Sequence, residues 1–299
     1  MALRTPRGRS SSTTRSSPKQ QLSPWMSPNP AKRWTECFFL LYSPVWITWC
    51  LLILVPFKLY DNLGQWGYMS LGLIAALPCA IFPIFYESKA DAARPWSQKY
   101  WVKANVWIAI FSFIGNYFWT HYFYSLLGAK YTFPAHRLND VPITLYFMTH
   151  AYFCLYHALA NVLIRRVRTH FTTSGPLMQN LAEIFVVFTL SYATAYGETL
   201  TIAHFPYYSF ENKAAMYKIG SLFYAIYFFV SFPMFYRMDE EASSGKTRYG
   251  LWRVVVDALA AGMIVTCLLD FWRLGVGGIY ETAVPTPKSG GWRFGLPWL

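Results

Sequence analysis

An acidic residue, Glu198, lies inside an otherwise uncharged apolar stretch of the chain, Ile184–Ala203. No basic residue within that stretch can neutralise its charge. An ionised carboxylate is costly to keep in apolar surroundings, so we expect Glu198 to hold its proton at neutral pH. A neutral carboxylic acid in a dry pocket can act as a general acid. Glu198 is therefore the first candidate for a catalytic proton donor.

Three histidines are further candidates for moving a proton, because an unperturbed imidazole titrates close to neutral pH. His150 and His157 lie together in the apolar stretch Pro142–Ile164. His121 lies near the end of the stretch Ala104–Tyr124 and is the main alternative as the acid. For the first two histidines, a structural role and a catalytic role are equally open.

Seven long apolar stretches must position these groups. The 299 residues are 55% hydrophobic and only 13% charged, whereas a soluble domain has about a quarter charged residues. Each stretch is long enough for a helix to cross a hydrocarbon core of about 30 Å, and helices satisfy their own backbone there. The sequence predicts an all-α, polytopic transmembrane helical bundle with about seven spans: Cys37–Phe57, Gly67–Tyr86, Ala104–Tyr124, Pro142–Ile164, Ile184–Ala203, Ile219–Tyr236 and Val254–Phe271.

The distribution of basic residues indicates how the bundle is oriented. With the amino terminus in the cytosol, the cytosolic segments hold 18 Lys and Arg residues and the opposite side holds eight. This asymmetry is typical of membrane proteins, whose cytosolic loops are enriched in basic residues. The formal net charge of +12 is thus explained by topology and contact with lipid head groups, and we expect no nucleic-acid partner.

Residues 1–35 differ in composition from the rest of the chain. They are rich in Ser, Thr, Pro and Arg and contain no acidic residue. We expect a disordered basic tail in the cytosol, with an organelle-targeting segment as the alternative. Residues 36–299 are expected to form one integral membrane domain, and the sequence leaves its oligomeric state open.

Polar residues in three of the stretches recur at helical spacing, so each set forms a stripe on its helix. Lipid offers these groups no hydrogen-bond partners, so we expect the stripes to face one another around a polar cavity. For the first stripe, hydrogen bonding between helices is the simpler explanation. The stripes are Asn105, Ser112, Asn116 and Thr120; Tyr146, His150, Cys154, His157 and Asn161; and Ser191, Thr194, Glu198 and Thr201.

Two other acidic residues near the carboxyl end have basic neighbours at helical spacing. Asp257 follows Arg253 by four residues, and Asp270 precedes Arg273 by three. Both pairs can close along one helix face, so we expect structural ion pairs at both positions.

The sequence shows no motif for nucleotide-dependent or metal-dependent chemistry. The chain has no glycine-rich nucleotide-binding motif, and its six histidines show neither HExxH nor closely spaced histidine boxes. We therefore expect no metal and no cofactor. Two classes of function remain: acid–base catalysis on an apolar substrate, and transport by a proton-coupled or lipid transporter.

Eleven motifs in a fixed order resemble the cycloeucalenol cycloisomerase family, and they span residues 28–298. The resemblance is specific because the motifs are many and long. They are PNPAKRW (28–34), YWVKAN (100–105), GNYFWTHYF (115–123), YTFP (131–134), FPYY (205–208), AMYKIG (215–220), LFYAIYF (222–228), SFPMFYRMDE (231–240), VVDAL (255–259), DFWRL (270–274) and GLPW (295–298).

This resemblance implies an isomerase of the endoplasmic reticulum membrane that acts in phytosterol synthesis. Such an enzyme opens the 9β,19-cyclopropane ring of the sterol cycloeucalenol to give obtusifoliol, without a cofactor. A sterol Δ8–Δ7 isomerase is the neighbouring alternative, because it would use the same protonation chemistry on a double bond.

Ring opening requires protonation of C19, cationic character at C9 and loss of the proton at C8. The expected acid is Glu198, with His121, His150 and His157 as the other candidates for proton transfer. Aromatic faces can stabilise a cation by about 0.5–2 kcal/mol each. The expected substrate-binding residues are the aromatic Trp119, Tyr122, Tyr224 and Tyr227 and the polar Asn116 and Thr194.

Overall fold

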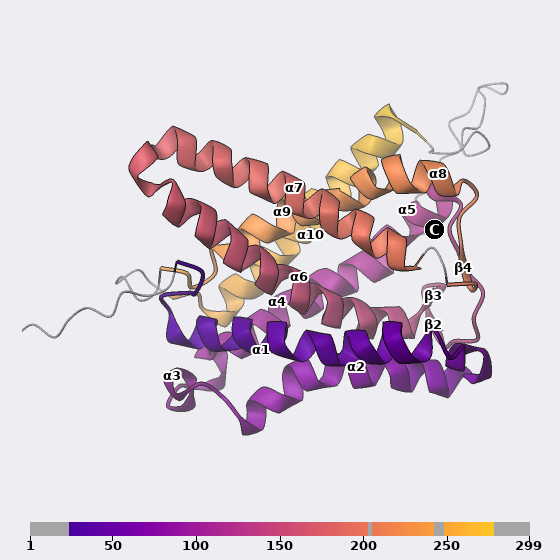
Figure 1. Cartoon of the computed structure of the whole chain (residues 1–299), viewed down its shortest axis with the longest axis horizontal. Helices are drawn as coiled ribbons and strands as arrows, with labels where there is room; N and C mark the ends of the chain where they lie inside the picture. The colour runs from indigo at the N-terminus through magenta and orange to yellow at the C-terminus, as the bar shows by residue number, and fades with distance from the viewer. Residues whose placement is uncertain (1–23, 203–204, 242–247, 278–299) are drawn as a thin grey trace, which may run out of the picture.

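The protein is described by a computed structural model that covers residues 24–202, 205–241 and 248–277. These residues form seven long helical rods that lie side by side along the long axis of the molecule (Figure 1). The all-α fold class predicted from the sequence is confirmed. The rods are α1 (Pro30–Ile47) with η1 (Thr48–Leu54); α2 (Gln65–Phe85); α4 (Tyr100–Ile114) with η4 (Gly115–Trp119) and α5 (Thr120–Leu127); α6 (Ile143–His170); α7 (Pro176–Ile202); α8 (Lys213–Ala215) with η6 (Met216–Gly220) and α9 (Ser221–Tyr236); and α10 (Leu251–Gly275).

Five of these rods are long and apolar enough to cross a membrane: Pro30–Leu54, Gln65–Phe85, Ile143–His170, Lys213–Tyr236 and Leu251–Gly275. The chain is therefore a multi-pass membrane protein. The rods Tyr100–Leu127 and Pro176–Ile202 correspond to the third and fifth expected spans. Because they do not meet the same criterion of hydropathy and charge, the count of seven spans stays a prediction.

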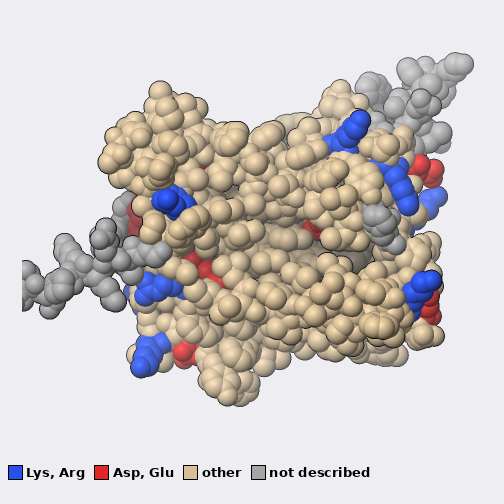
Figure 2. Space-filling view, in the orientation of Figure 1, with Lys and Arg blue, Asp and Glu red and all other residues tan. Residues whose placement is uncertain are grey.

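The surface has the character expected of a bundle surrounded by lipid. Lys and Arg on the face seen in Figure 2 gather at the two ends of the molecule, and the middle is largely uncharged. Large apolar side chains project outward from the rods, as with Leu41 on α1, Phe85 on α2 and Phe185 on α7, each more than two-thirds exposed. Such exposure suits hydrocarbon contact, because lipid tails are as apolar as these side chains.

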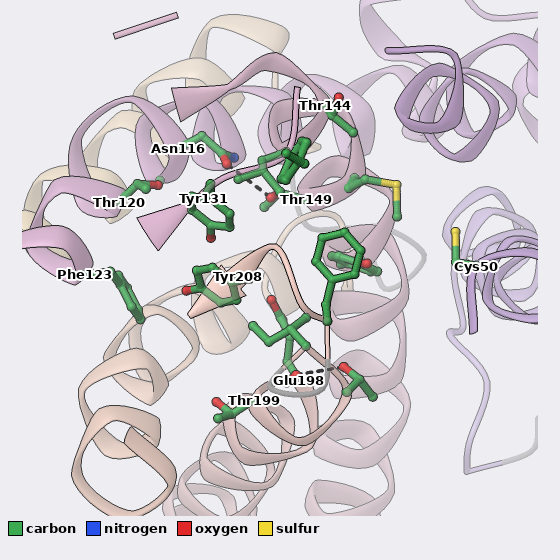
Figure 3. A pocket seen from close by; sticks show the side chains of 18 of the residues that line it. Cys50, Asn116, Thr120, Phe123, Tyr131, Thr144, Thr149, Glu198, Thr199 and Tyr208 are labelled. Carbon is green, nitrogen blue, oxygen red and sulfur yellow. Dashed lines mark hydrogen bonds between the residues drawn. The ribbon is translucent and has the colours of Figure 1, made fainter. Parts of the chain in front are cut away.

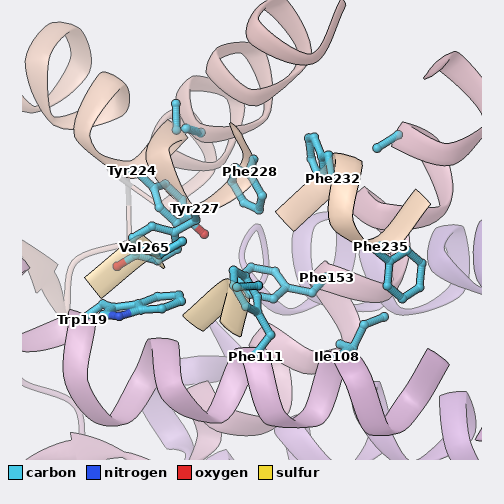
Figure 4. Close-up of a cluster of buried hydrophobic side chains, with 14 of the residues drawn as sticks. Ile108, Phe111, Trp119, Phe153, Tyr224, Tyr227, Phe228, Phe232, Phe235 and Val265 are labelled. Carbon is cyan, nitrogen blue, oxygen red and sulfur yellow. The ribbon is translucent and has the colours of Figure 1, made fainter. Parts of the chain in front are cut away.

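Helix α6 is the centre of the bundle and packs against α1, α2, α4, α7 and α9. Its inner face joins a core of aromatic side chains from α4, α6 and α9 (Figure 4). Trp107, Phe111 and Phe228 are fully buried there. Because apolar burial gives helices little reason to associate within lipid, close packing of such rings must hold the rods together.

Short elements connect the rods. On the amino-terminal side lie α3 (Lys89–Ala92), η3 (Trp96–Gln98) and η5 (Thr172–Ser174), and on the opposite side lie η2 (Leu59–Asn62) and four two-residue strands. Strand β2 (Arg137–Leu138) pairs with β3 (Val141–Pro142), and β1 (Lys130–Tyr131) pairs antiparallel with β4 (Tyr208–Ser209). The second pairing places Tyr131 opposite Tyr208, with their rings stacked at 4.2 Å.

Gly128 ends α5 and turns the chain toward β1. It has a φ of 59°, a conformation that glycine adopts without steric strain. A Cβ atom at this position would clash with the side chain of Glu211. The turn therefore requires glycine both for its backbone angle and for the space it leaves.

The first helix begins earlier than the sequence suggested. The side chain of Asn29 accepts a hydrogen bond from the backbone N–H of Ala31 and caps α1, and Pro30 occupies the first turn, a position that favours proline. Ala31 and Lys32 are fully buried. The folded domain thus includes residues 30–35 of the tail expected at 1–35, while residues 1–23 lie outside the described residues.

A buried ionic network joins the rods at their amino-terminal end. Arg165 on α6 bridges Glu36 on α1, at 2.9 Å, and Glu240 in the segment after α9. Lys32 also pairs with Glu240, at 2.9 Å. All four side chains are at least nine-tenths buried, so each charge is compensated where water is scarce.

A second buried pair extends this network. Lys103 on α4 contacts the carboxylate of Asp239, which also accepts a hydrogen bond from the backbone N–H of Tyr249 at 2.7 Å. We call Lys32, Glu36, Lys103, Arg165, Asp239 and Glu240 the ionic network. It clamps α1, α4 and α6 to the segment that follows α9.

One of the two expected ion pairs within α10 is confirmed and the other is wrong. Arg273 binds Asp270 at 2.8 Å, as its spacing predicts. Asp257 instead pairs with Arg237 and accepts a hydrogen bond from Trp107 at 3.1 Å. Arg253 lies over the ring of Tyr249 at 3.8 Å. Helical spacing allowed the local pair, but a partner from the preceding loop took its place.

Candidate active site

A cavity of about 220 Å³ lies in the half of the bundle away from the ionic network. Its walls come from η1, the start of α2, η4, the first half of α6, the end of α7 and the start of α9. Figure 2 shows a hollow on this side of the molecule, between the layer of α1 and α2 and the layer of α7. Most of the wall is apolar or aromatic, which suits a largely hydrocarbon ligand.

Glu198 supplies the one carboxyl group of the described cavity wall. It is half-buried on α7, one turn before the helix ends (Figure 3). The hydroxyl of Tyr224 donates a hydrogen bond to its Oε2 atom at 2.8 Å. None of the ion pairs formed among the described residues includes Glu198.

This geometry leaves Glu198 able to exchange a proton with a ligand. Tyr156 also hydrogen-bonds this carboxyl. With Oε2 accepting from Tyr224, a neutral Glu198 can carry its acid proton on Oε1. The tyrosine hydroxyl would also stabilise the carboxylate that forms after proton donation. The arrangement therefore fixes the orientation of an acid and stabilises its conjugate base.

Aromatic rings surround the same side of the cavity. Tyr224 and Tyr227 on α9 meet edge to face at 4.9 Å, and Phe123 packs against both. Phe153 from α6 and Tyr208 from β4 also line the wall. Ring faces attract positive charge, so a transient carbocation here would be stabilised without meeting a strong nucleophile.

Three π-helical segments occur among the described residues, and each contributes to the cavity wall. Cys50, Leu51 and Leu54 come from η1, Asn116 from η4 and Met216 from η6. Such wider turns are rare in proteins and concentrate at functional sites. Their convergence on one cavity, from three separate rods, supports this cavity as the functional site.

Four of the residues expected at the site come together in the cavity. Glu198, Asn116, Tyr224 and Tyr227 all line it. Asn116 is buried, and its side-chain amide donates to the carbonyl of Ser112 at 2.8 Å. Their roles in catalysis and binding stay predictions.

Trp119, Tyr122 and Thr194, which were also expected to bind substrate, do not line the cavity. Trp119 is buried in the core and donates to the hydroxyl of Thr266 at 2.8 Å. Tyr122 donates to the carboxylate of Asp270 at 3.1 Å. Thr194 lies one turn before Glu198 on α7 and is half-buried outside the cavity wall. The two aromatic residues thus have hydrogen-bond partners within the protein, and their role in binding substrate stays a prediction.

The three candidate histidines likewise lie outside the cavity wall. His121 contacts the backbone carbonyl of Asn139 at 3.0 Å, and His150 contacts the side-chain oxygen of Asn105 at 3.0 Å. His157 is fully buried and bonds through Nδ1 to the carbonyl of Phe153 at 2.8 Å. For these three imidazoles, the geometry favours the structural role over the catalytic one.

The expected facing of the three polar stripes holds only in part. Asn116 and Thr120 of the first stripe and Glu198 and Thr201 of the third reach the cavity. The second stripe, on α6, faces α4 and α1 instead: His150 meets Asn105, and Asn161 donates to Glu36 at 2.8 Å. Helical spacing fixed which residues share a face but not which neighbour the face meets.

Sequence reasoning missed several residues of the wall. Thr149 and Tyr152 lie on α6, one and two positions away from the stripe residue His150. Tyr131 and Tyr208 come from loop strands separated by 77 positions in the chain. The motifs YTFP and FPYY contain these two tyrosines, but only the strand pairing explains why they belong together.

Among residues 24–202, 205–241 and 248–277, no group of three or more His, Cys, Asp and Glu side chains is placed to hold a metal ion. A reaction without metal or cofactor stays a prediction, for which the catalytic groups would be side chains of the chain itself.

Comparison with known proteins identifies the family. No family model and no solved structure matches the chain. The chain is 50% identical to a cycloeucalenol cycloisomerase of Arabidopsis thaliana over 277 residues, which cover 92% of this chain and 96% of that protein. A match of this identity and coverage confirms the resemblance read from the motifs. The chain belongs to the cycloeucalenol cycloisomerase family.

Proposed function

We propose that this protein is an isomerase that opens the 9β,19-cyclopropane ring of cycloeucalenol to give obtusifoliol. Its family membership supports the reaction, and the largely apolar wall of the cavity supports a hydrocarbon substrate. The observation that carries the mechanism is Glu198, a carboxyl on the wall of that cavity that forms no ion pair with any residue the structure describes. The membrane of the endoplasmic reticulum is the proposed location.

The reaction begins with transfer of the Glu198 proton to C19. The bond between C19 and C9 breaks, C19 becomes part of a methyl group, and positive charge develops at C9. The proton at C8 is then lost and its bonding electrons form the C8–C9 double bond. One proton is gained and one is lost, so the reaction needs no oxidant, reductant or cofactor.

The surroundings of Glu198 suit both proton transfers. The carboxylate left after donation can accept the C8 proton, because C8 is bonded directly to the cationic centre. Tyr224 holds that carboxylate in place throughout. The apolar wall keeps bulk water away from the cation, which would otherwise be trapped as an alcohol.

Turnover by the purified full-length chain tests this function. The protein, in detergent micelles supplemented with lipid, is incubated with cycloeucalenol in the presence of a metal chelator and without nucleotide. Mass spectrometry and NMR should identify obtusifoliol as the product. Folded protein that yields no ring-opened sterol would contradict the proposal. A Δ7 product from a Δ8 sterol would indicate the neighbouring isomerase, and flux of unchanged cargo across proteoliposomes would indicate a transporter.

A further inference from the structure

Three polar side chains form a second, uncharged polar site on the cavity wall. Asn116 comes from η4, Thr120 opens α5 and Thr149 lies on α6. Figure 3 shows them along one side of the pocket, with Glu198 on another side. We call Asn116, Thr120 and Thr149 the amide–threonine patch.

The patch has unused hydrogen-bonding capacity. Thr149 donates to Oδ1 of Asn116 over a long distance of 3.4 Å, and the Asn116 amide donates to the carbonyl of Ser112. A side-chain amide has two N–H donors and two acceptor positions, so one of each remains free. The hydroxyl of Thr120 forms no side-chain hydrogen bond within the described residues. Asn116 is buried and the two threonines are half-buried, and polar groups removed from water normally have partners, so these groups are suited to a ligand.

The chemistry of the patch selects the kind of ligand group. It offers both donors and acceptors, and none of its three side chains is charged. An alcohol needs this combination, since a hydroxyl donates one hydrogen bond and accepts two. Another part of the wall, with Cys50, Leu51 and Leu54 of η1, is apolar and suits hydrocarbon.

We propose that the amide–threonine patch binds the 3-hydroxyl group of the sterol. This assignment rests on the proposed function, since it takes the substrate to be a sterol alcohol. Anchoring the hydroxyl at the patch sets how far the rigid ring system extends across the cavity. It thereby determines which carbon atoms lie beside Glu198, so the patch positions the substrate for ring opening.

A pair of substrates tests the proposal: cycloeucalenol and its 3-deoxy analogue, which keeps the cyclopropane ring but lacks the hydroxyl. The ratio of their kcat/KM values reports recognition of the hydroxyl alone. We expect the wild-type chain to prefer the alcohol by about tenfold or more, as sites that hydrogen-bond a substrate hydroxyl do. Thr149→Val, which keeps the shape of the side chain, should lower that ratio about threefold or more.

Thr199→Val is the matched control. Thr199 lines the same cavity, but its hydroxyl already donates to the carbonyl of Ala195 at 2.9 Å. Its substitution should change both kcat/KM values by the same factor and leave the ratio at the wild-type value. Thermal unfolding of each variant in detergent shows that the comparison is made on folded protein.

Two results would overturn the assignment. One is equal turnover of the two sterols by the wild-type chain. The other is a Thr149→Val variant that loses activity on both sterols equally, which would indicate a structural role. If no cyclopropyl sterol is converted at all, the proposed function fails. Binding of the two sterols, measured by quenching of tryptophan fluorescence, then tests the patch independently of turnover with the same variants and the same expected ratios.

Discussion

The two ends of the helical bundle bury acidic side chains in opposite ways. At the amino-terminal end, Glu36 and Glu240 share Arg165, and Lys32 adds a second positive charge to Glu240. In the other half, Glu198 has a tyrosine hydroxyl and no ion pair among the described residues. The bundle thus contains glutamates of two kinds: those that pair with buried cations and one that does not.

This difference separates structural from chemical roles. A carboxylate with buried cationic partners holds segments together, because removing either partner would leave an unpaired charge. Glu240 is a poor proton donor, since Lys32 and Arg165 favour its ionised form. A carboxyl without such partners contributes little to stability but can hold a proton for transfer. The comparison predicts that substitutions at the two ends affect different measurements.

The largest expected effect is on turnover by Glu198→Gln. The amide keeps the size of the side chain and can still accept from Tyr224, but it cannot donate an acidic proton. We expect turnover of cycloeucalenol to fall by about 10²–10⁴-fold, the usual contribution of a general acid, while sterol binding is retained. Product formation by mass spectrometry and binding by fluorescence give the two values.

Glu183→Gln is the control for this substitution. Glu183 lies on the same helix but pairs with Arg168 at the opposite end, so turnover should stay within about twofold of the wild type. Near-wild-type turnover by the Glu198 variant would remove this residue from the mechanism. His121, His150 and His157 would then be the next groups to substitute.

The second prediction concerns Arg165→Met at the ionic network. This change removes the ion-pair partner of Glu36 and one of the two partners of Glu240. Breaking a buried pair in this way destabilises a protein by about 3–5 kcal/mol. Unfolding of the detergent-solubilised chain should show the loss.

Arg166→Met should cost less than about 1 kcal/mol, because Arg166 only stacks over the ring of Trp25 at 5.2 Å. Equal stability of the two variants would contradict a clamping role for the network.

The third prediction is a pH dependence of stability. Burial alone would raise the pKa of Glu240, but Lys32 and Arg165 outweigh it and lower the pKa to about 2. A carboxyl whose pKa falls on folding stabilises the protein above the unfolded value of about 4.3, and this contribution is lost as the pH falls toward 2. The shift corresponds to about 3 kcal/mol. Above about pH 5, Glu240 should therefore contribute nothing to the change of the free energy of unfolding with pH.

Below about pH 5, the free energy of unfolding should fall steadily as the pH falls, because the stabilising contribution of ionised Glu240 is lost. Glu240→Gln, followed in the same detergent across the same range, should have a shallower slope between about pH 4.5 and 2. Identical slopes for the variant and the wild type would show that this carboxyl is not held ionised by the network.

The smallest predicted effect is that of Tyr224→Phe. Its hydroxyl makes one hydrogen bond to Glu198, which is worth about 0.5–1.5 kcal/mol, or about threefold to tenfold in rate. Because this residue acts through Glu198, the pH at which turnover is half-maximal should also shift, while KM stays nearly constant. Tyr192→Phe, a half-buried α7 tyrosine outside the cavity wall, should leave both quantities unchanged. A changed KM with an unchanged pH profile would indicate that Tyr224 only shapes the cavity.

The contrast between the two ends also shows what the sequence could predict. Glu198 was identified because its lack of a charged neighbour is a local property of the chain. The ionic network was not, because Lys32 and Glu240 are more than 200 positions apart and only the packing of the rods joins them. Two quoted motifs, PNPAKRW and SFPMFYRMDE, contain these residues, so the network gives those motifs a physical explanation.

The positions of the helices could be predicted from the sequence, whereas the neighbour that each helix face contacts could not. The apolar stretches indicated the rods because a membrane-spanning helix needs about 20 consecutive, mostly apolar residues, and the sequence shows such a run directly. His157 and Asn161 were correctly placed on one face of α6, yet that face packs against α4 and α1. Which neighbour a stripe meets depends on the rotation and order of all the rods, and no local pattern records it.

Deuterium transfer from solvent tests the central claim most directly. Enzyme in excess over cycloeucalenol is equilibrated in heavy water, so that each molecule performs one turnover with an exchanged Glu198 carboxyl. We expect one deuterium in the C19 methyl group of obtusifoliol, located by NMR. Ring-opened product whose C19 methyl carries no deuterium would contradict this expectation.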